Sequence, residues 1–407
     1  MYCYFGGMSM LLSLAVIFLV GFSAAAICSA VRLPRIIGMI ATGIVVGPYV
    51  LDWLDPTILS ISPQLRQIAL IIILIRAGLT LNLADLKKVG RPAVMMSFVP
   101  ACLEILGYFC FAPLLLGLSR VEALLMGAVL SAVSPAVVVP RMIRLIEDRR
   151  GTEKSIPQMI LAGASCDDIF VIVLFSTFLT MAQGESAPLW QLVNIPVSIA
   201  LGVVLGAAAG FVMYLLFDFS KKRGLKIRGS VKTIILLSAA FLLMTAENRL
   251  KDTVAVSGLL AVVAMACLIK LKSEQTESQS LSGSFGKLWI AAEVLLFVLV
   301  GAAVDIRYTL SAGAMAVAMI FIALAFRTVG VFLCMIGTPL SAKERLFCVI
   351  AYLPKATVQA SIGAVPLSMG LPCGNMILSV AVLAILITAP MGAIGIDVSQ
   401  KRLLRQN

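Results

Sequence analysis

Hydrophobic residues occur in long runs from one end of this chain to the other. Thirteen apolar segments can be placed at roughly 8–31, 36–51, 65–83, 92–117, 121–143, 157–181, 190–217, 231–247, 253–270, 286–304, 309–337, 344–369 and 374–395. An α-helix rises about 1.5 Å per residue, so about 20 residues cross the hydrocarbon core of a bilayer. The pattern predicts an all-α integral membrane protein with about thirteen transmembrane helices, the second of which is short.

The composition supports a single membrane domain over residues 1–407. Of these 407 residues 61% are hydrophobic and only 13% are charged, whereas soluble domains carry about 25% charged residues. The first apolar run begins near Met8 without a basic region before it, so we interpret it as a transmembrane helix and not as a cleaved signal peptide.

The positions of Lys and Arg predict an orientation. With the N-terminus outside, 24 of the 32 Lys and Arg residues fall in cytoplasmic segments and 5 in the opposite loops. This bias favours an inner (cell) membrane protein with an external N-terminus and a cytoplasmic C-terminus. The net charge of +12 then reflects basic cytoplasmic loops and not binding to nucleic acid.

The spacing of the segments predicts two inverted repeats. Repeat one covers about 8–181, a joining helix about 190–217 and repeat two about 231–395, before a short cytoplasmic tail at 396–407. Equivalent helices lie about 223 residues and seven crossings apart, so they run in opposite directions. The polar run Ser273–Ser280 is expected to be a solvated loop.

Two adjacent carboxylates, Asp167 and Asp168, lie in the middle of the sixth apolar segment. A charged side chain near the bilayer centre costs about 2.5–3.5 kcal/mol even on a lenient scale, so it needs a partner, a proton or a water-filled cavity. Neighbouring helical residues point about 100° apart, so the two can have different surroundings. Their oxygens suit Na⁺ or Li⁺, by the preference of hard cations for oxygen ligands. A buried structural ion pair is the alternative.

Prolines interrupt two segments at similar places. The fifth contains Ser134 and Pro135, and the twelfth contains Pro354, Lys355 and Thr357. Proline removes a backbone donor, and the freed carbonyls need water, a side chain or an ion. Interrupted helices at matching places in two halves indicate an ion site near the midplane. We therefore predict that Ser134 and Thr357 line the site, against the alternative of ordinary proline kinks.

Two further buried charges, Glu104 and Arg327, lie 223 residues apart in equivalent segments. Because a buried pair neutralises both charges, we predict an ion pair between them. Arginine does not release a proton at useful pH, so this pair is expected to be structural. Histidine is absent and the nine cysteines have no CxxC spacing, so proton chemistry must use carboxylates or Lys.

Four motifs in order resemble the sodium/proton antiporters of the NHA branch, within the double-aspartate type of the monovalent cation/proton antiporter superfamily. They are Ile75-Arg-Ala-Gly-Leu79, Val133-Ser-Pro-Ala-Val-Val-Val-Pro140, Asp167-Asp168 and Pro354-Lys-Ala-Thr-Val-Gln-Ala360. The resemblance implies a core domain with two crossing broken helices, a scaffold domain that forms a homodimer, and elevator-like alternating access.

The same resemblance implies roles for individual residues. Asp168 would be the main ion ligand, with Asp167 beside it, and Glu104 would pair with Arg327. Electrogenic members usually carry Lys where this chain has Arg327, and the nearest Lys here is Lys355. Lys355 is therefore a candidate for coupling, and the proton-to-cation ratio stays open.

We therefore expect a secondary antiporter that exchanges Na⁺ or Li⁺ for H⁺, without a cofactor. A K⁺/H⁺ antiporter or a sodium-coupled organic-anion symporter on the same fold is the alternative. An intramembrane aspartyl protease is disfavoured because its two carboxylates must face each other from separate helices. The phosphate-binding motif of ATP-driven pumps is missing from the sequence.

Overall fold

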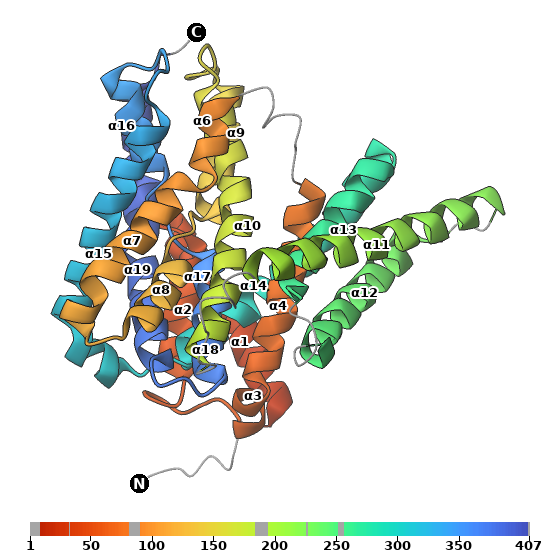
Figure 1. The fold of residues 1–407 in the computed structure, drawn as a ribbon. Helices are drawn as coiled ribbons and strands as arrows, with labels where there is room; N and C mark the ends of the chain where they lie inside the picture. Colours follow the sequence, from red (N-terminus) through yellow and green to blue (C-terminus); the bar gives the residue numbers. More distant parts are fainter. Residues whose placement is uncertain are drawn as a thin grey trace. The chain divides into compact units, whose positions relative to one another are not determined.

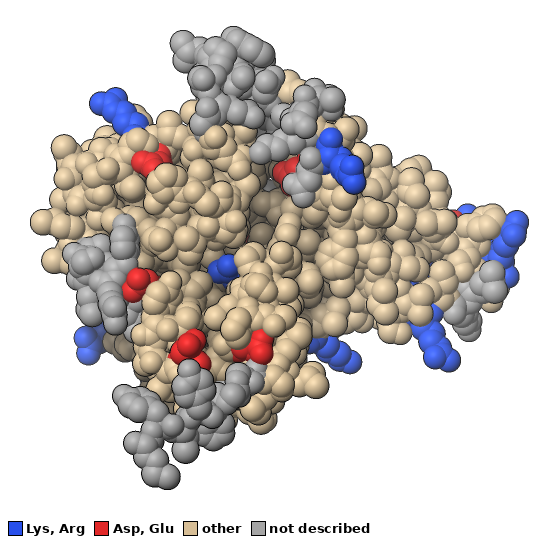
Figure 2. Space-filling model, turned by 90° about the horizontal axis from the view of Figure 1, so that it is seen from below, with Lys and Arg blue, Asp and Glu red and all other residues tan. Residues whose placement is uncertain are grey.

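A computed structural model describes residues 9–31, 33–80, 90–183, 194–224, 227–250 and 256–405. Every element in these ranges is helical, and none of them contains a strand (Figure 1). On the face drawn in Figure 2, residues other than Lys, Arg, Asp and Glu make up most of the surface. Both features are those of an α-helical membrane protein.

Each of the thirteen predicted segments falls on one or more helices. The helices are α1 (Met10–Ala30), α2 (Arg35–Val46), α3 (Pro56–Ser60), α4 (Ser62–Thr80), α6 (Arg91–Met96), α7 (Val99–Leu116), α8 (Arg120–Leu130), α9 (Pro135–Glu147), α10 (Ile156–Ala182), α11 (Asn194–Lys222), α12 (Gly229–Leu250), α13 (Gly258–Lys272), α14 (Gln275–Ala302), α15 (Ile306–Cys334), α16 (Ala342–Ala351), α17 (Thr357–Gly363), α18 (Val365–Ser368) and α19 (Gly374–Leu403). Within the described ranges, nine helices are long and apolar enough to cross a membrane.

Two predicted boundaries were wrong. The run Ser273–Ser280 is not a loop throughout, because α14 already begins at Gln275. Glu277 lies in its first turn and forms an ion pair with Lys232, which stabilises this polar extension of an apolar helix. The helix α19 also continues past the predicted end at residue 395, through most of the expected tail, to Leu403.

The chain divides into two compact units. Unit 1 comprises Met1–Arg66, Leu83–Val171 and Val294–Asn407, and unit 2 comprises Gln67–Asn82 and Ile172–Glu293. In unit 1, α7 packs along α15, and α19 packs against α16 and α17. In unit 2, α11 packs along α13.

The fifth and twelfth predicted segments are broken helices of unit 1. The helix α8 ends at Leu130, residues 131–134 are non-helical, and α9 begins at Pro135. Likewise α16 ends at Ala351 and α17 begins at Thr357, after non-helical residues 353–356. We call residues 131–134 the first break and residues 353–356 the second break.

The two breaks meet. The amide of Ser134 donates to the carbonyl of Pro354 at 2.8 Å, so the chain segments at the two breaks are in direct contact. The helices that lead into them begin with the same cap: Ser119 and Glu122 form a capping box on α8, and Ser341 and Glu344 form one on α16. The prediction that these two segments are interrupted is confirmed.

Glycines allow a close helix contact in unit 2. Gly202, Gly206 and Gly210 lie along one face of α11, at spacings of four residues, against α13 and the residue before it. A Cβ atom at Gly206 would lie 2.1 Å from the carbonyl oxygen of Ala261. Small residues at such a face let two helix backbones approach closely in a membrane, where no hydrophobic effect drives them together.

This packing makes a first prediction. Gly206→Ala should destabilise unit 2 by about 1–3 kcal/mol, because the new methyl group overlaps the backbone of α13. The melting temperature in detergent should fall by several degrees. Gly286→Ala is the matched control, since a Cβ atom at this α14 position meets nothing within 4 Å. Equal melting temperatures of the two variants would contradict the close contact.

Candidate functional site

The adjacent carboxylates lie on one continuous helix but have different surroundings. Asp167 and Asp168 are both on α10, and Asp167 is completely buried. Asp168 is partly exposed. Because consecutive helical residues point about 100° apart, one side chain can pack against neighbouring elements while the other is accessible. The two carboxylates therefore differ in exposure.

Asp167 is anchored to the first break. Its Oδ2 atom accepts a hydrogen bond from the backbone amide of Val133 at 2.8 Å and one from Nη2 of Arg327 at 3.4 Å. Its second oxygen, Oδ1, is buried and has no hydrogen-bond partner in the described part of the chain. One side of this carboxylate is therefore fixed and the other is free to bind a ligand.

Asp168 contributes a second free oxygen. Its Oδ1 atom is buried, and no group among the described residues donates a hydrogen bond to it. A buried carboxylate oxygen without a donor is energetically costly, so the group must bind a proton, a cation or water. Two neighbouring residues thus each present an unsatisfied carboxylate oxygen.

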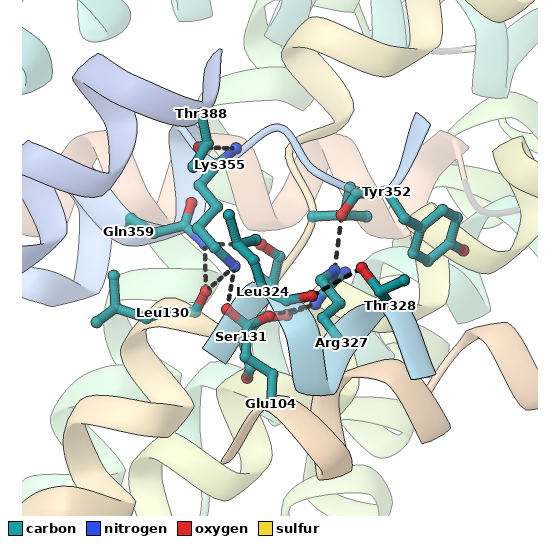
Figure 3. Close-up of polar contacts among 12 residues, drawn as sticks. Glu104, Leu130, Ser131, Leu324, Arg327, Thr328, Tyr352, Lys355, Gln359 and Thr388 are labelled. Carbon is teal, nitrogen blue, oxygen red and sulfur yellow. Dashed lines mark hydrogen bonds and ion pairs between the residues drawn. The ribbon is translucent and has the colours of Figure 1, made fainter. Parts of the chain in front are cut away.

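A network of four buried charges holds the breaks together, and Figure 3 shows three of them, Glu104, Arg327 and Lys355. Arg327 Nη1 pairs with Glu104 Oε2 at 2.8 Å, and Lys355 Nζ pairs with Glu104 Oε1 at 2.6 Å. Arg327 also reaches Asp167. The predicted pair of Glu104 and Arg327 is present. It is part of a larger network, because Glu104 also pairs with Lys355 and Arg327 also pairs with Asp167.

The two cations of this network also satisfy backbone carbonyls that the breaks leave free. Arg327 donates from Nη1 to the carbonyl of Ser131 and from Nε to the carbonyl of Tyr352 at 2.6 Å. Lys355 donates to the carbonyl of Leu130, the last residue of α8. A positive charge at the C-terminal end of a helix is favourable because the helix dipole is negative there.

The predicted hydroxyl groups are neighbours. Ser134 Oγ lies 3.5 Å from Thr357 Oγ1 and 3.5 Å from the backbone nitrogen of Thr357, which donates to it. Ser134 directly follows Val133, whose amide holds Asp167. Within the described ranges, no hydrogen bond joins either hydroxyl group to Asp168.

Gln359 is a member of the site to which the sequence assigned no role. Its Nε2 atom donates to the carbonyl of Ala132 at 2.7 Å, and its Oε1 atom accepts from the amide of Ala356 at 2.8 Å. It therefore joins the first break to the second. The only signal in the sequence was its place in the motif that ends at Ala360.

The charges of the network balance, apart from Asp168. Arg327 and Lys355 supply two positive charges, and Glu104 and Asp167 supply two negative charges in contact with them. Asp168 has no ion pair in the described part of the chain. Its negative charge is therefore left to be neutralised by a mobile ion, which is either a proton or a cation.

Comparison with known proteins gives consistent matches along nearly the whole chain. The family model described as "Sodium/hydrogen exchanger, transmembrane" matches residues 14–398. Sodium/hydrogen exchanger 9B2 of Homo sapiens is 32% identical over 394 residues, which are 92% of this chain and 70% of that protein. Sodium/hydrogen exchanger 9B2 of Xenopus tropicalis is 32% identical over 355 residues, which are 85% of this chain and 65% of that protein. This chain thus spans only about two thirds of the length of these relatives.

A solved structure with the same fold is that of the sodium proton antiporter MjNhaP1 from Methanocaldococcus jannaschii at pH 8. It superposes with a TM-score of 0.80 at 21% sequence identity, over 97% of this chain and 99% of that chain. This match confirms the predicted all-α membrane fold.

The charge network makes a second prediction. Glu104→Gln leaves an excess positive charge and Arg327→Gln an excess negative charge among buried side chains, so each should cost about 3–5 kcal/mol. The double variant keeps one positive and one negative charge, Lys355 and Asp167, and should lose much less than the sum of the two. Melting temperatures in detergent measure all three.

The pair of Arg141 and Asp397 provides the control for this cycle. It is also an ion pair of unit 1, at 3.2 Å, but both side chains are partly exposed. Since such pairs contribute about 0–1 kcal/mol, its two single variants should have small, additive effects. Additive losses in the Glu104 and Arg327 cycle would show that the two residues are not coupled.

Proposed function

We propose that this chain, which belongs to the sodium/hydrogen exchanger family, exchanges Na⁺ or Li⁺ for protons across a membrane by alternating access. It is a multi-pass membrane protein and a secondary transporter, not an enzyme. The observation that carries the proposal is the carboxylate of Asp168, which has no ion pair among the described residues. It lies next to a network of four charges that already neutralise one another.

Competition for one carboxylate is sufficient to couple the two fluxes. When Asp168 is ionised, its charge favours binding of a cation, and when it is protonated the cation loses its main ligand. The fixed pairs around it do not need to change. Each time the site changes from one side of the membrane to the other, it then carries either a cation or a proton. Antiport requires this.

The proposed cation ligands are oxygens. The free Oδ1 atoms of Asp168 and Asp167 supply negative charge, and the hydroxyl groups of Ser134 and Thr357 lie at the breaks, close to the amide that anchors Asp167. Hard cations prefer such ligands. Glu104, Arg327 and Lys355 are assigned to the fixed network that positions Asp167.

A K⁺/H⁺ antiporter on the same fold is the alternative that uses the same residues. A sodium-coupled organic-anion symporter would need unpaired donors near the cation site to bind the anion. Lys355, Arg327 and Gln359 are instead each committed to acceptors of the protein. This arrangement favours antiport.

The proposed setting is the inner (cell) membrane, with the N-terminus outside, the C-terminus in the cytoplasm, and two copies forming a homodimer. The bias of Lys and Arg toward alternate segments supports the orientation. Figure 1 supports an odd number of crossings, because α1 begins at the lower end of unit 1 and α19 ends at its upper end. The homodimer rests on the resemblance to the antiporter family.

A third prediction tests the role of Asp168. Asp168→Asn keeps the shape of the side chain and removes its charge, so Na⁺-dependent proton flux in proteoliposomes should fall to the background level while the melting temperature is kept. Asp218→Asn is the control, because Asp218 pairs with an exposed Lys222 on the same helix in unit 2. Normal flux in the Asp168 variant would refute the proposal.

A fourth prediction concerns pH. If protons and Na⁺ compete for Asp168, protonation should weaken Na⁺ binding once the pH is below the pKa of the site. The half-saturating Na⁺ concentration should then rise about tenfold for each further pH unit. Dequenching of a pH-sensitive dye at several fixed pH values, with Na⁺, Li⁺ and K⁺ in parallel, measures this and ranks the cations. A half-saturating concentration that is independent of pH would contradict a shared site.

A further inference from the structure

The connection between α9 and α10, residues 148–155, has a strained backbone. Three of its residues have positive φ angles: Arg149 at 52°, Gly151 at 65° and Ser155 at 51°. This left-handed region is unfavourable for residues other than glycine, and it persists where the surrounding structure holds the chain in place. The α9–α10 connection must therefore be held by contacts with other elements.

The residues that follow α19 supply one such contact. The carbonyl oxygen of Arg405 accepts a hydrogen bond from the amide of Gly151 at 2.9 Å. The side chain of Leu404 is only 5% exposed, and both of its methyl carbons lie 3.3 Å from the place that a Cβ atom would take on Gly151. Leu404 belongs to the same buried apolar cluster as Leu145 of α9 and Ile156 of α10. We call the contact of Leu404 and Arg405 with Gly151 the latch.

Two ion pairs tie the same region to further helices. Lys154 Nζ pairs with Glu344 Oε2, in the first turn of α16, at 2.9 Å. Arg141 of α9 pairs with Asp397 of α19 at 3.2 Å. All these contacts lie within unit 1, at the end where α19 ends (Figure 1). The α9–α10 connection is thus attached to both α16 and α19.

The helices that meet here lead to the candidate site. The helix α9 begins directly after the first break, α16 leads to the second break, and α10 carries Asp168. Asp168 lies roughly 18 Å from Ile156 along the axis of α10, at about 1.5 Å per residue. Because packed helices transmit displacements along their length, the α9–α10 connection sets the position of the first break relative to Asp168.

We propose that the latch is a conformational switch of the cation site. When it is closed, it holds the α9–α10 connection in its strained conformation and keeps the first break aligned with Asp168. When it opens, the connection relaxes and the site loses affinity for the cation. Without a cation the closed form is favoured by about tenfold, as is usual for two states between which a ligand selects. This inference rests on the proposed exchange of cations for protons.

The size of the latch fits this role. It consists of one leucine side chain and one backbone hydrogen bond, and contacts of this size can open locally while the rest of a protein stays folded. A cation that binds only when the latch is closed must itself favour closure. An open latch then lowers the apparent affinity, but saturating cation restores the full rate. A general loss of folded protein would lower the rate at every cation concentration.

Leu404→Ala is the direct test. Truncation of a buried leucine to alanine weakens its contacts by roughly 30-fold or more, so the latch of most molecules should be open without Na⁺. The half-saturating Na⁺ concentration for exchange in proteoliposomes should rise about threefold or more, while the rate at saturating Na⁺ stays that of the wild type.

Val398→Ala is the matched control for this variant. It also shortens an apolar side chain near the end of α19, but Val398 is 60% exposed. The half-saturating Na⁺ concentration should therefore stay at the wild-type value. An equal rise in both variants, or no rise in Leu404→Ala, would overturn the proposal.

Gly151→Ala tests the other side of the latch and does not depend on how Leu404→Ala folds. The new methyl group meets Leu404 at a residue with positive φ, so this variant should also raise the half-saturating Na⁺ concentration. Gly370→Ala is its control, because Gly370 in unit 1 has a φ of +74° but a Cβ atom there meets nothing within 4 Å. Both variants should lower the melting temperature. A rise in the half-saturating concentration that is the same in both would mean that backbone strain alone is responsible.

Hydrogen exchange tests the coupling in the opposite direction. Na⁺ should slow exchange of the backbone amides of residues 148–156, including that of Gly151, relative to choline at the same ionic strength. The equal ionic strength keeps screening of the pair of Lys154 and Glu344 constant. Asp168→Asn should abolish this effect of Na⁺. Exchange rates that do not respond to Na⁺ in a wild-type protein that transports it would contradict the proposal.

Failure of the inference and failure of the proposed function give different results. If the wild-type protein shows no cation-dependent proton flux, or Asp168→Asn keeps it, the proposed function is wrong. If the wild-type protein exchanges and Asp168→Asn does not, while Leu404→Ala and Gly151→Ala keep the wild-type half-saturating Na⁺ concentration, only the role of the latch is wrong.

Discussion

The structure of unit 1 depends on one constraint: backbone groups freed by a broken helix inside a membrane must find partners within the protein. Water is absent from the hydrocarbon region, and each unsatisfied group there costs several kcal/mol. The first break exposes the carbonyls of Leu130, Ser131 and Ala132, and these are met by Lys355, Arg327 and Gln359. Broken helices are thus possible here because other elements supply donors at the same place.

The same donors impose a charge balance. Arg327 and Lys355 bring positive charge to the end of α8, and Glu104 and Asp167 compensate it. Because a buried ion pair is stable only when its geometry and hydrogen bonds are complete, this network resists change. The carboxylate left outside the balance, Asp168, is partly exposed. Under the proposed function, the structural charge and the charge that binds the transported ion are therefore on two adjacent residues of one helix.

The sequence revealed the residues whose presence in a membrane is costly. Buried charges and prolines inside apolar segments are visible without a structure, and they led to the two breaks, the two carboxylates and the pair of Glu104 and Arg327. A serine and a glutamate cap α8, and the same pair caps α16 222 residues later. This repetition is visible in the sequence and supports the proposed repeats. That signal was missed because each cap alone is common.

Other features could not be predicted, since they depend on which elements meet in space. Lys355 was a candidate for coupling, but the sequence did not indicate that it pairs with Glu104 or that Arg327 also reaches Asp167. The role of Gln359 depends on a peptide unit of the first break, and no residue type identifies the orientation of a backbone group. Neutral residues that act through the backbone leave little trace in composition or spacing.

The charge balance also bears on energetics under the proposed function. If Asp167 stays ionised in the fixed network, binding of either a proton or a monovalent cation brings Asp168 and its surroundings to the same net charge of zero. The site therefore has no net charge when it is exposed first to one side of the membrane and then to the other, whether it holds a proton or a cation. An uncompensated charge would be most costly in the low-dielectric core. The empty site, with Asp168 ionised, keeps one negative charge. Its change from one side of the membrane to the other is therefore the least favourable of the three. An exchanger needs this order of energies, because the loaded site must cross more readily than the empty one if the two fluxes are to stay coupled.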